Sequence, residues 1–364
     1  MKFVRLLLLC SLAISSSLLS SGPASILFGE SSHLSSEPLV FCGPASQALG
    51  EQVAYYLGHP LGKAKIDRFN DGESRIQILD NVRNRDVFVL ESTCACPPLS
   101  VNDRYMELFL MIRTLKRASA QRVTVIMPYY GYARQDRKSH PRVPISASDV
   151  AMLLETAGAD RVIAVDLHCG QIQGFFHHAP VDNLYASTVF VPYMAQLELV
   201  DPVVVSPDAG GVERAKRFRD GMEKRGVDAD LAVIVKQRSE AGKIDTMSLI
   251  GSVEGCDAII IDDICDTAGT LCKAAAELKG LGAKRVFACI THPVFSGPAL
   301  ERIASSEIDR LVVTDTIPLH GDISPNIKQL SIAGLLAEAI HRTHEGDSLS
   351  ALFDLEHFNL PIAL

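Results

Sequence analysis

The residues best suited to chemistry lie together in one stretch of the chain, AIIIDDICDTAGTL. Its first residues, Ala258 to Ile261, form a short apolar run without alternation, which is typical of a parallel strand covered on both faces. Asp262 and Asp263 follow, and Asp266 to Thr270 then lead into a helical pattern. The order predicts a strand, a pair of carboxylates, a short loop and a helix.

This loop has the properties of a phosphate site. A loop that opens a helix offers backbone N–H groups and the positive end of the helix dipole. Thr267 and Thr270 add hydroxyl donors, and Ala268 and Gly269 let the backbone approach a ligand closely. The paired acids suit sugar hydroxyls or a cation. The stretch therefore predicts a phosphorylated sugar at the carboxyl edge of an open α/β sheet, and the alternative is an acidic cap on an ordinary helix.

Further motifs follow one another in a fixed order along the chain. They are Phe69–Glu73 (FNDGE), Gly131–Arg137 (GYARQDR), Asp166–His168 (DLH), Gln171–Phe176 (QIQGFF) and Ser206–Gly211 (SPDAGG). The DDICDTAGT string resembles the ribose 5-phosphate signature of type I phosphoribosyltransferases. All motifs together resemble the ribose-phosphate pyrophosphokinases (PRPP synthases) from about Pro38 to about Phe353.

The resemblance implies a fold and a reaction. The fold is α/β, with two tandem type I phosphoribosyltransferase-like domains, each a mostly parallel sheet flanked by helices. The expected ranges are 1–37 for a targeting or extension segment, 38–185 and 186–330 for the two domains, and 331–364 for a C-terminal helix and tail. The reaction transfers the pyrophosphoryl group of Mg-ATP to the 1-hydroxyl of ribose 5-phosphate, giving 5-phosphoribosyl 1-diphosphate and AMP for nucleotide biosynthesis.

The resemblance also assigns residues to roles. Lys236 and Arg238 match two essential cations of a mobile catalytic loop. Asp262, Asp263, Asp266, Thr267, Ala268, Gly269 and Thr270, together with Arg238, match the ribose 5-phosphate site. Phe69, Asp71, Gly72, Glu73, Arg134 and Gln135 match the ATP site, and His168 and Asp208 match the metal site for Mg²⁺. The FNDGE tip would reach the adenine in a neighbouring subunit, which implies a homo-oligomer, expected as a hexamer built from dimers.

Each assignment has a plainer alternative. The FNDGE segment is also a hairpin turn signal, and the charged segments around Arg134 and Lys236 could be solvated loops. Histidine is an unusual ligand for Mg²⁺, which prefers oxygen, so His168 could contact a phosphate or a metal-bound water. His177-His178 stands where the family often has an acid after the double Phe, and this leaves an additional metal or regulatory site there in doubt.

The pattern of the chain supplies elements to hold these motifs. Strands are expected at Val40–Phe41, Asp86–Glu91, Arg122–Met127, Val162–Val165, Val203–Val205, Leu231–Val235, Ala258–Ile261, Arg285–Ile290 and Arg310–Thr314. Helices are expected at Ala45–Leu57, Asn102–Ala118, from Asp149 to Ala157, Val212–Gly226, Leu271–Lys279 and Ile332–His344. The motifs follow strand ends, where ligands of open α/β sheets bind.

Composition limits the function classes. The 364 residues are 47% hydrophobic and 21% charged with a net charge of −8, which argues against a nucleic-acid binder. The nine cysteines form no CxxC pair, and Cys94 and Cys96 are the closest; scattered thiols favour a reducing compartment. No membrane partner is expected, because the apolar run near the start is interrupted by serines.

The first residues do not fit the rest of the chain. Lys2 and Arg5 precede an apolar run and a Ser-rich tract, with no acid before Glu30. This pattern fits a secretory signal, an organellar transit peptide or a misassigned start. We expect a cytoplasmic protein, or an organelle interior after removal of a transit segment. The rival functions are a phosphoribosyltransferase, which needs no ATP motifs, and a non-catalytic regulatory subunit, which should lack the loop cations.

Overall fold

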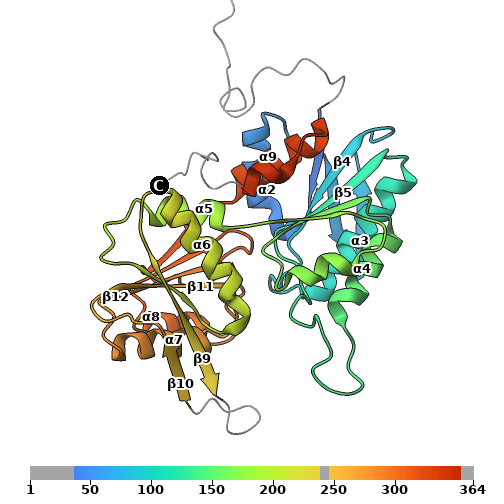
Figure 1. Cartoon of the computed structure of the whole chain (residues 1–364). Helices are drawn as coiled ribbons and strands as arrows, with labels where there is room; N and C mark the ends of the chain where they lie inside the picture. Colours follow the sequence, from blue (N-terminus) through green and yellow to red (C-terminus); the bar gives the residue numbers. More distant parts are fainter. Residues whose placement is uncertain (1–36, 238–245, 354–364) are drawn as a thin grey trace, which may run out of the picture.

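The computed structural model describes residues 37–237 and 246–353. In these residues it contains two large sheets with a shared layer of helices between them, and a separate two-stranded hairpin (Figure 1). The first sheet has the strand order β1-β4-β5-β6-β7, and all its neighbours pair in parallel. Its strands are β1 (Leu39–Cys42), β4 (Asp86–Leu90), β5 (Arg122–Met127), β6 (Arg161–Val165) and β7 (Val181–Leu184).

The second sheet has the order β10-β9-β8-β11-β12-β13-β14, and within the described residues only β9 and β10 pair antiparallel. Its strands are β8 (Val203–Ser206), β9 (Asp230–Gln237), β10 (Thr246–Ile250), β11 (Asp257–Cys265), β12 (Arg285–Pro293), β13 (Arg310–Thr314) and β14 (Ile327–Leu330). The chain runs from β8 to β9 on one side and continues with β11 on the other. The direction of winding therefore reverses between β8 and β11, and such a point opens a ligand crevice at the carboxyl ends.

The helices separate into outer and inner layers. The outer face of the first sheet packs on α3 (Val101–Arg117), α4 (Ser146–Ala157) and η2 (Gly170–Phe175), and that of the second packs on α7 (Gly269–Gly280) and α8 (Ala299–Ala304). Between the sheets lie α2 (Gln47–Leu57), α5 (Ser187–Met194), α6 (Val212–Lys224) and α9 (Ala333–Glu345), with η1 (Pro44–Ser46), η3 (Ala209–Gly211) and η4 (Leu349–Phe353) as short connections. Coverage on both faces agrees with the apolar strands and confirms the predicted fold class.

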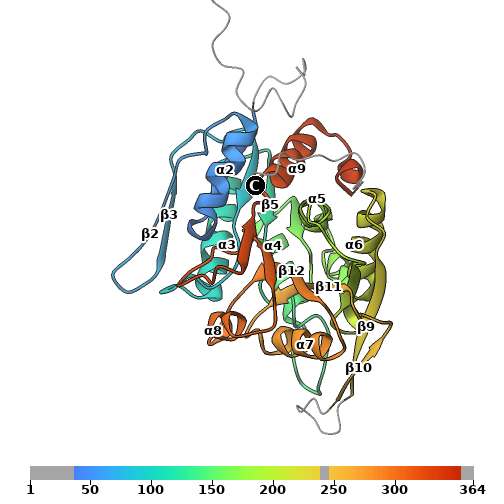
Figure 2. The same cartoon turned by 90° about the vertical axis from the view of Figure 1, so that its left-hand side faces the viewer.

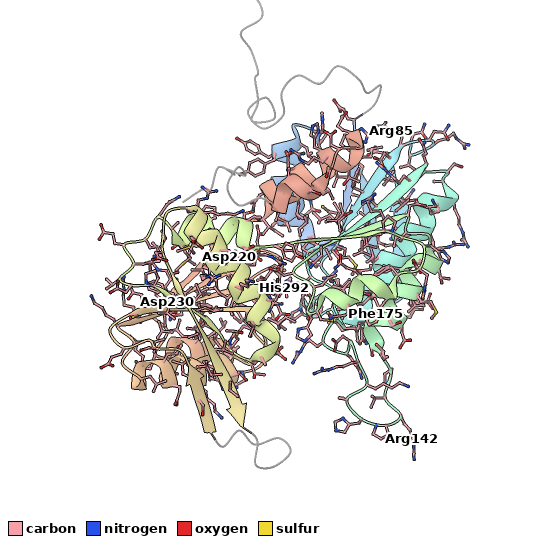
Figure 3. All side chains as sticks on the ribbon, viewed as in Figure 1. Arg85, Arg142, Phe175, Asp220, Asp230 and His292 are labelled. Carbon is pink, nitrogen blue, oxygen red and sulfur yellow. The ribbon has the colours of Figure 1, made fainter. Side chains whose placement is uncertain are left out.

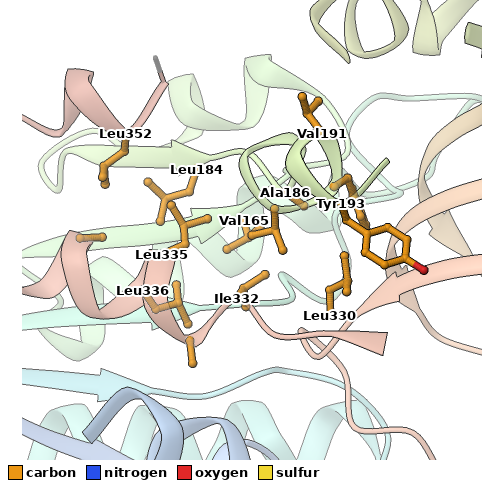
Figure 4. Close-up of a cluster of buried hydrophobic side chains, with 14 of the residues drawn as sticks. Val165, Leu184, Ala186, Val191, Tyr193, Leu330, Ile332, Leu335, Leu336 and Leu352 are labelled. Carbon is orange, nitrogen blue, oxygen red and sulfur yellow. The ribbon is translucent and has the colours of Figure 1, made fainter. Parts of the chain in front are cut away.

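One apolar core joins the two halves. Its buried side chains come from the inner faces of both sheets and from all four inner helices. Figure 4 shows Val165 and Leu184 of the first sheet, Leu330 of the second sheet, and Leu335 and Leu336 of α9 in this core. Because close-packed interiors resist displacement, this shared core holds the carboxyl edges of the two sheets in a defined relation.

Helix α9 follows the last strand of the second sheet but packs against the first half, beside α2 (Figure 1). His344 contacts Asp86 with 2.8 Å between Nδ1 and Oδ2, and Arg122 donates to the carbonyl of Thr343 at 2.9 Å. Arg122 also pairs with Asp86. The range 331–364, predicted as a separate C-terminal segment, thus includes a helix that ties the two halves together.

The strands β2 (Ala64–Arg68) and β3 (Ser74–Ile78) form the predicted hairpin, which projects from the side of the first half (Figure 2). Arg68 anchors its base, since it donates to Asp103 at 3.0 Å and to Glu107 at 2.9 Å. Arg68 also donates to the carbonyl of Gly72 at 2.7 Å, which stiffens the turn. The tip is therefore held in an extended position by polar contacts at its base.

Several elements differ from their predicted ranges. Strand β11 continues to Cys265, so Asp262 and Asp263 lie within it rather than after it. The sequence pattern ended the strand at the first acid because charged residues are depleted in strands. The prediction also omitted β7, β10, β14, α5 and α8, which are short or lie at sheet edges and therefore carry weak periodicity.

We predict that Leu336→Ala destabilises both halves together. Leu336 is fully buried in the shared core, so its truncation should lower the free energy of unfolding by about 2–5 kcal/mol. Chemical denaturation followed by fluorescence and circular dichroism measures this loss. Leu153→Ala is the matched control, because Leu153 is 46% exposed and should change stability little. A loss for Leu336→Ala no larger than the control would contradict the shared core.

The contact between α9 and the first half should depend on pH. Burial raises the pKa of Asp86, but hydrogen bonds from Arg122 and His344 outweigh it and hold this pKa below its ordinary value. A lowered folded-state pKa adds stability that is present above the unfolded-state pKa of about 4 and is lost as pH falls. We expect the stability difference between the wild type and Asp86→Asn to shrink as pH falls below about 4. Urea denaturation at several pH values tests this; a difference independent of pH would refute it.

Candidate active site

The paired acids of β11 lie in a compact group of charges. Asp263 is buried, and its Oδ2 lies 2.7 Å from Nδ1 of His168, which follows β6 in the other half. Arg214, in the first turn of α6, places Nη1 3.2 Å from Oδ1 of Asp263 and 3.6 Å from Oδ1 of Asp262. The side chain of Asp262 is 31% exposed, against 4% for Asp263. Asp262 is therefore the acid that can meet a ligand, and Asp263 holds the two basic residues.

The environment separates the two acids in their affinity for protons. Burial raises the pKa of Asp263, but the hydrogen bond with His168 and the charge of Arg214 outweigh it and hold this pKa well below its usual range. Burial and the adjacent Asp263 raise the pKa of Asp262. The hydrogen bond with Asp263 raises the pKa of His168. A ligand or cation at Asp262 would thus meet a carboxyl group whose pKa is raised by the adjacent Asp263.

The segment before His168 is held by the second half. Asp166 has a positive φ of 42°, and its Oδ2 accepts from Thr291 at 2.6 Å and from the N–H of Ala186 at 3.1 Å. The Nε2 of His292 lies 3.2 Å from the carbonyl oxygen of Asp166. Figure 3 shows His292 where the two halves meet. These contacts between halves set the position from which His168 reaches Asp263.

The predicted phosphate loop turns into α7 as expected. Ala268 adopts the left-handed conformation with φ of 59°, and the helix begins at Gly269. Arg302 of α8 donates to the carbonyl of Thr267 at 2.9 Å. The first N–H groups of α7 and the guanidinium of Arg302 bring positive character to the loop, and this suits an anion.

An ion pair links this loop to the predicted ATP loop of the other half. Arg134 donates from Nη1 to Oδ2 of Asp266 at 2.7 Å. Burial raises the pKa of Asp266, but hydrogen bonds with Ser296 and Arg134 outweigh it and lower this pKa. The carboxylate of Asp266 is thus engaged with partners, so its backbone rather than its side chain would face a phosphate.

The predicted ATP loop, Gly131 to Arg137, is braced by hydroxyl groups. Gly131 donates its N–H to Oγ1 of Thr93 at 2.8 Å, and the hydroxyl of Tyr105 donates to the carbonyl of Gly131 at 2.7 Å. A Cβ at Gly131 would lie 2.6 Å from the carbonyl oxygen of Thr93, so only glycine fits without displacement. Ser146 donates to Oε1 of Gln135 at 2.6 Å. The loop therefore presents Arg134 and Gln135 from a fixed base.

The hairpin tip carries the other predicted ATP residues. Phe69 is 50% exposed with Arg75 over its ring, Gly72 has a φ of 97°, and Asp71 accepts from the N–H of Glu73. Within the described residues, the bonds made by this tip stay inside the hairpin and its base. The tip is thus presented to the exterior rather than to the acids of the same chain.

The remaining predicted residues have separate outcomes. Asp208 accepts from the N–H groups of Gly210 and Gly211 and caps η3. Lys236 lies near the end of β9, opposite Met247 of β10, and its side chain is outside the described part of the structure. Arg238 is outside it altogether. These assignments stay predictions.

His177 and His178 have a backbone role. Their N–H groups donate to one oxygen of Glu155 at 2.8 and 2.6 Å. In the ranges 37–237 and 246–353, no cluster of three His, Cys, Asp or Glu side chains could hold a metal ion. No helix in these ranges is long and apolar enough to cross a membrane.

Sequence reasoning missed several residues of the site, namely Arg214, Thr291, His292 and Arg302. The sequence predicts a helix at Val212–Gly226 but does not single out Arg214 within it. A usable signal was its place in the first turn after the SPDAGG motif, which puts it at the carboxyl edge of β8. Thr291 and His292 end a strand on the same edge.

Comparison with known proteins identifies the family. Residues 39–158 match the N-terminal domain of ribose phosphate pyrophosphokinase, and residues 203–354 match the phosphoribosyl synthetase-associated domain. The chain is 52% identical to the ribose-phosphate pyrophosphokinase of Burkholderia pseudomallei over 86% of its length and 97% of that protein. The chain belongs to the ribose-phosphate pyrophosphokinase family. This confirms the resemblance seen in the motifs.

Other members of the family agree. The ribose-phosphate pyrophosphokinase of Wolinella succinogenes is 50% identical over 86% of this chain and 98% of its own length. The crystal structure of phosphoribosylpyrophosphate synthetase from Mycobacterium smegmatis superposes with a TM-score of 0.78 at 40% identity. It covers 85% of this chain and all of its own, so the family fold extends over both halves.

We predict that Arg214→Gln lowers the free energy of unfolding, because the paired acids lose a positive charge beside them. Removing one partner of a buried charge group typically costs about 3–5 kcal/mol, because the remaining charges stay desolvated. Asp262→Asn in the Arg214→Gln background should recover part of this loss by removing one negative charge. Urea denaturation of the wild type, both single variants and the double variant measures the coupling. Additive effects of the two substitutions would show that Arg214 does not compensate Asp262.

Proposed function

We propose that the protein transfers the β,γ-pyrophosphoryl group of ATP to the 1-hydroxyl of ribose 5-phosphate and releases AMP. The observation that carries the proposal is the 2.7 Å ion pair between Arg134 and Asp266. It joins the ATP loop of the first half to the phosphate loop of the second, so the binding elements for two phosphorylated substrates lie side by side. The names and coverage of the relatives support the same reaction.

In this proposal, each part of the second half has its own role in binding ribose 5-phosphate. The N–H groups of Asp266 to Thr270 hold the 5-phosphate at the start of α7. Asp262, the exposed member of the acid pair, accepts hydrogen bonds from ribose hydroxyls. Asp263 positions His168 and Arg214 around it. Because the 1-hydroxyl must reach the β-phosphorus in line with the leaving AMP, such positioning is the main contribution to phosphoryl transfer.

Charge on the transferring group requires cations. Lys236 and Arg238 match the family's loop cations and would neutralise this charge. Mg²⁺, when bound with ATP, offsets charge on the phosphate oxygens. Carboxylate oxygens are the ligands that Mg²⁺ prefers. Asp208, which follows β8, and Asp262, in β11, are the acids that would hold it, and His168 would contact a phosphate or a metal-bound water.

The ATP site would be completed by a second copy of the chain. Phe69 lies at the tip of the hairpin and is 50% exposed. The hairpin projects from the side of the first half (Figure 2). A base stacked on Phe69, with Asp71 and Glu73 at its amino group, therefore requires this tip to reach a neighbouring subunit. We propose a homo-oligomer, a hexamer built from dimers, as the active form.

The reaction is tested by AMP release from Mg-ATP with and without ribose 5-phosphate. Release should depend on the sugar phosphate and fall at least about 10²-fold in Lys236→Ala, since a charge-stabilising donor is lost. Lys279→Ala is the matched control, because Lys279 lies at the far end of α7 and pairs with Asp309. It should keep near-normal turnover.

The rival functions give different results in this assay. A phosphoribosyltransferase would release pyrophosphate from 5-phosphoribosyl 1-diphosphate and no AMP from ATP. A non-catalytic subunit would bind ATP without releasing AMP. Near-normal turnover in Lys236→Ala would remove Lys236 from the mechanism.

A further inference from the structure

Two thiols and an imidazole meet where the loop after β4 touches the second half. The Sγ of Cys96 lies 3.1 Å from Nε2 of His320, which belongs to the segment after β13. Cys94 belongs to a buried apolar cluster with Ala45, Tyr129 and Ile317, and Cys96 packs against the same cluster. Cys96 and Leu99 exchange two backbone hydrogen bonds of 3.0 and 2.9 Å, so the turn is closed and holds Cys96 toward His320.

The surroundings of Cys96 favour its thiolate. A hydrogen bond from Cys94 lowers the pKa of Cys96 to about 5. Burial opposes this shift, and His320 and Arg104 add to it. Glu91 is also close to Cys96, but it is fully buried, and burial raises its pKa well above the ordinary value. It therefore adds little negative charge near the sulfur at neutral pH.

Cys96 differs from the other half-buried thiols of the described residues. Burial raises the pKa of Cys169, Cys256 and Cys272. Cys96 is only half-buried, and its neighbours Ala95 and Pro97 are exposed, so a small reagent can approach it. A thiolate with access to solvent and a second thiol in contact is the arrangement of a redox-sensitive pair.

We propose that Cys96 and Cys94 form a reversible thiol–disulfide site that reacts with hydroperoxides. The Cys96 thiolate attacks the terminal oxygen of the hydroperoxide, the O–O bond breaks, and the departing alkoxide or hydroxide takes a proton. The product is a sulfenic acid at Cys96. The Cys94 sulfur then attacks this sulfur, water leaves with the Cys94 proton, and a disulfide forms. The two thiols lose two electrons in total, and the hydroperoxide gains them.

The chain geometry permits this bond. Residues separated by one other residue lie at most about 7 Å apart between Cα atoms, close to the range that disulfides span.

The segment that carries the two cysteines also contacts both halves of the molecule. Ser92 donates to the carbonyl of Thr316 in the second half, and Thr93 donates to that of Tyr129, just before the ATP loop. Oxidation would therefore act on a segment that contacts both halves.

The test is peptide mapping of the full-length reduced protein after one equivalent of hydrogen peroxide at neutral pH. Both cysteines lie in the tryptic peptide 86–104, which should lose the mass of two hydrogen atoms and regain it with dithiothreitol. In the Cys94→Ser variant, oxidation should stop at a sulfenic acid on Cys96, which dimedone traps. Cys256→Ser is the matched control and should leave the disulfide unchanged.

Labelling with iodoacetamide tests the role of His320. In the wild type, Cys96 should react faster than Cys256 below pH 7. The His320→Gln substitution should slow the labelling of Cys96 roughly two- to tenfold, which is the effect of losing one hydrogen bond of ordinary net strength. The proposal is overturned if peptide 86–104 keeps both thiols while other cysteines oxidise, or if Cys96 reacts no faster than Cys256. Labelling unchanged in a folded His320→Gln variant would overturn the part assigned to His320.

Discussion

The apolar core shared by the two halves is the constraint on which the rest of the structure depends. Side chains from both sheets, α5 and α9 fill one continuous interior, so neither half can shift without opening cavities. The polar links across the junction, Arg134 to Asp266 and His168 to Asp263, need their partners within about 3 Å. Partly exposed ion pairs contribute little free energy by themselves. They therefore depend on the packed core for their geometry.

Within this frame, electrostatics decides how the acids can act. Two adjacent carboxylates in a partly buried crevice would repel each other and any phosphate. Arg214 and His168 come from different halves and engage Asp263, which leaves Asp262 as the exposed acid. The positive groups around the acids reduce this repulsion. The same arrangement makes the site sensitive to the relative position of the halves.

Much of the fold was predictable because periodicity reports burial. The apolar strands and amphipathic helices were found at or near their positions, and the turn at Asn70 to Gly72 was read correctly. Errors fell where local pattern and tertiary context disagree. Strand β11 runs past Asp262 because Arg214 and His168 compensate acids that would otherwise end a strand. The short strand β14 forms because β13 offers it an edge.

The sequence by itself determined the chemistry of the motifs, the family and the order of the elements, because residue types and spacings carry that information locally. Only the tertiary structure decided which residues meet. The sequence pattern did not single out Arg214, did not show that Asp266 pairs with Arg134, and did not link Cys96 to His320. Their contacts join segments far apart in the chain, and no local pattern encodes such distances. They arise from packing the two sheets on one core, which is a property of the whole fold.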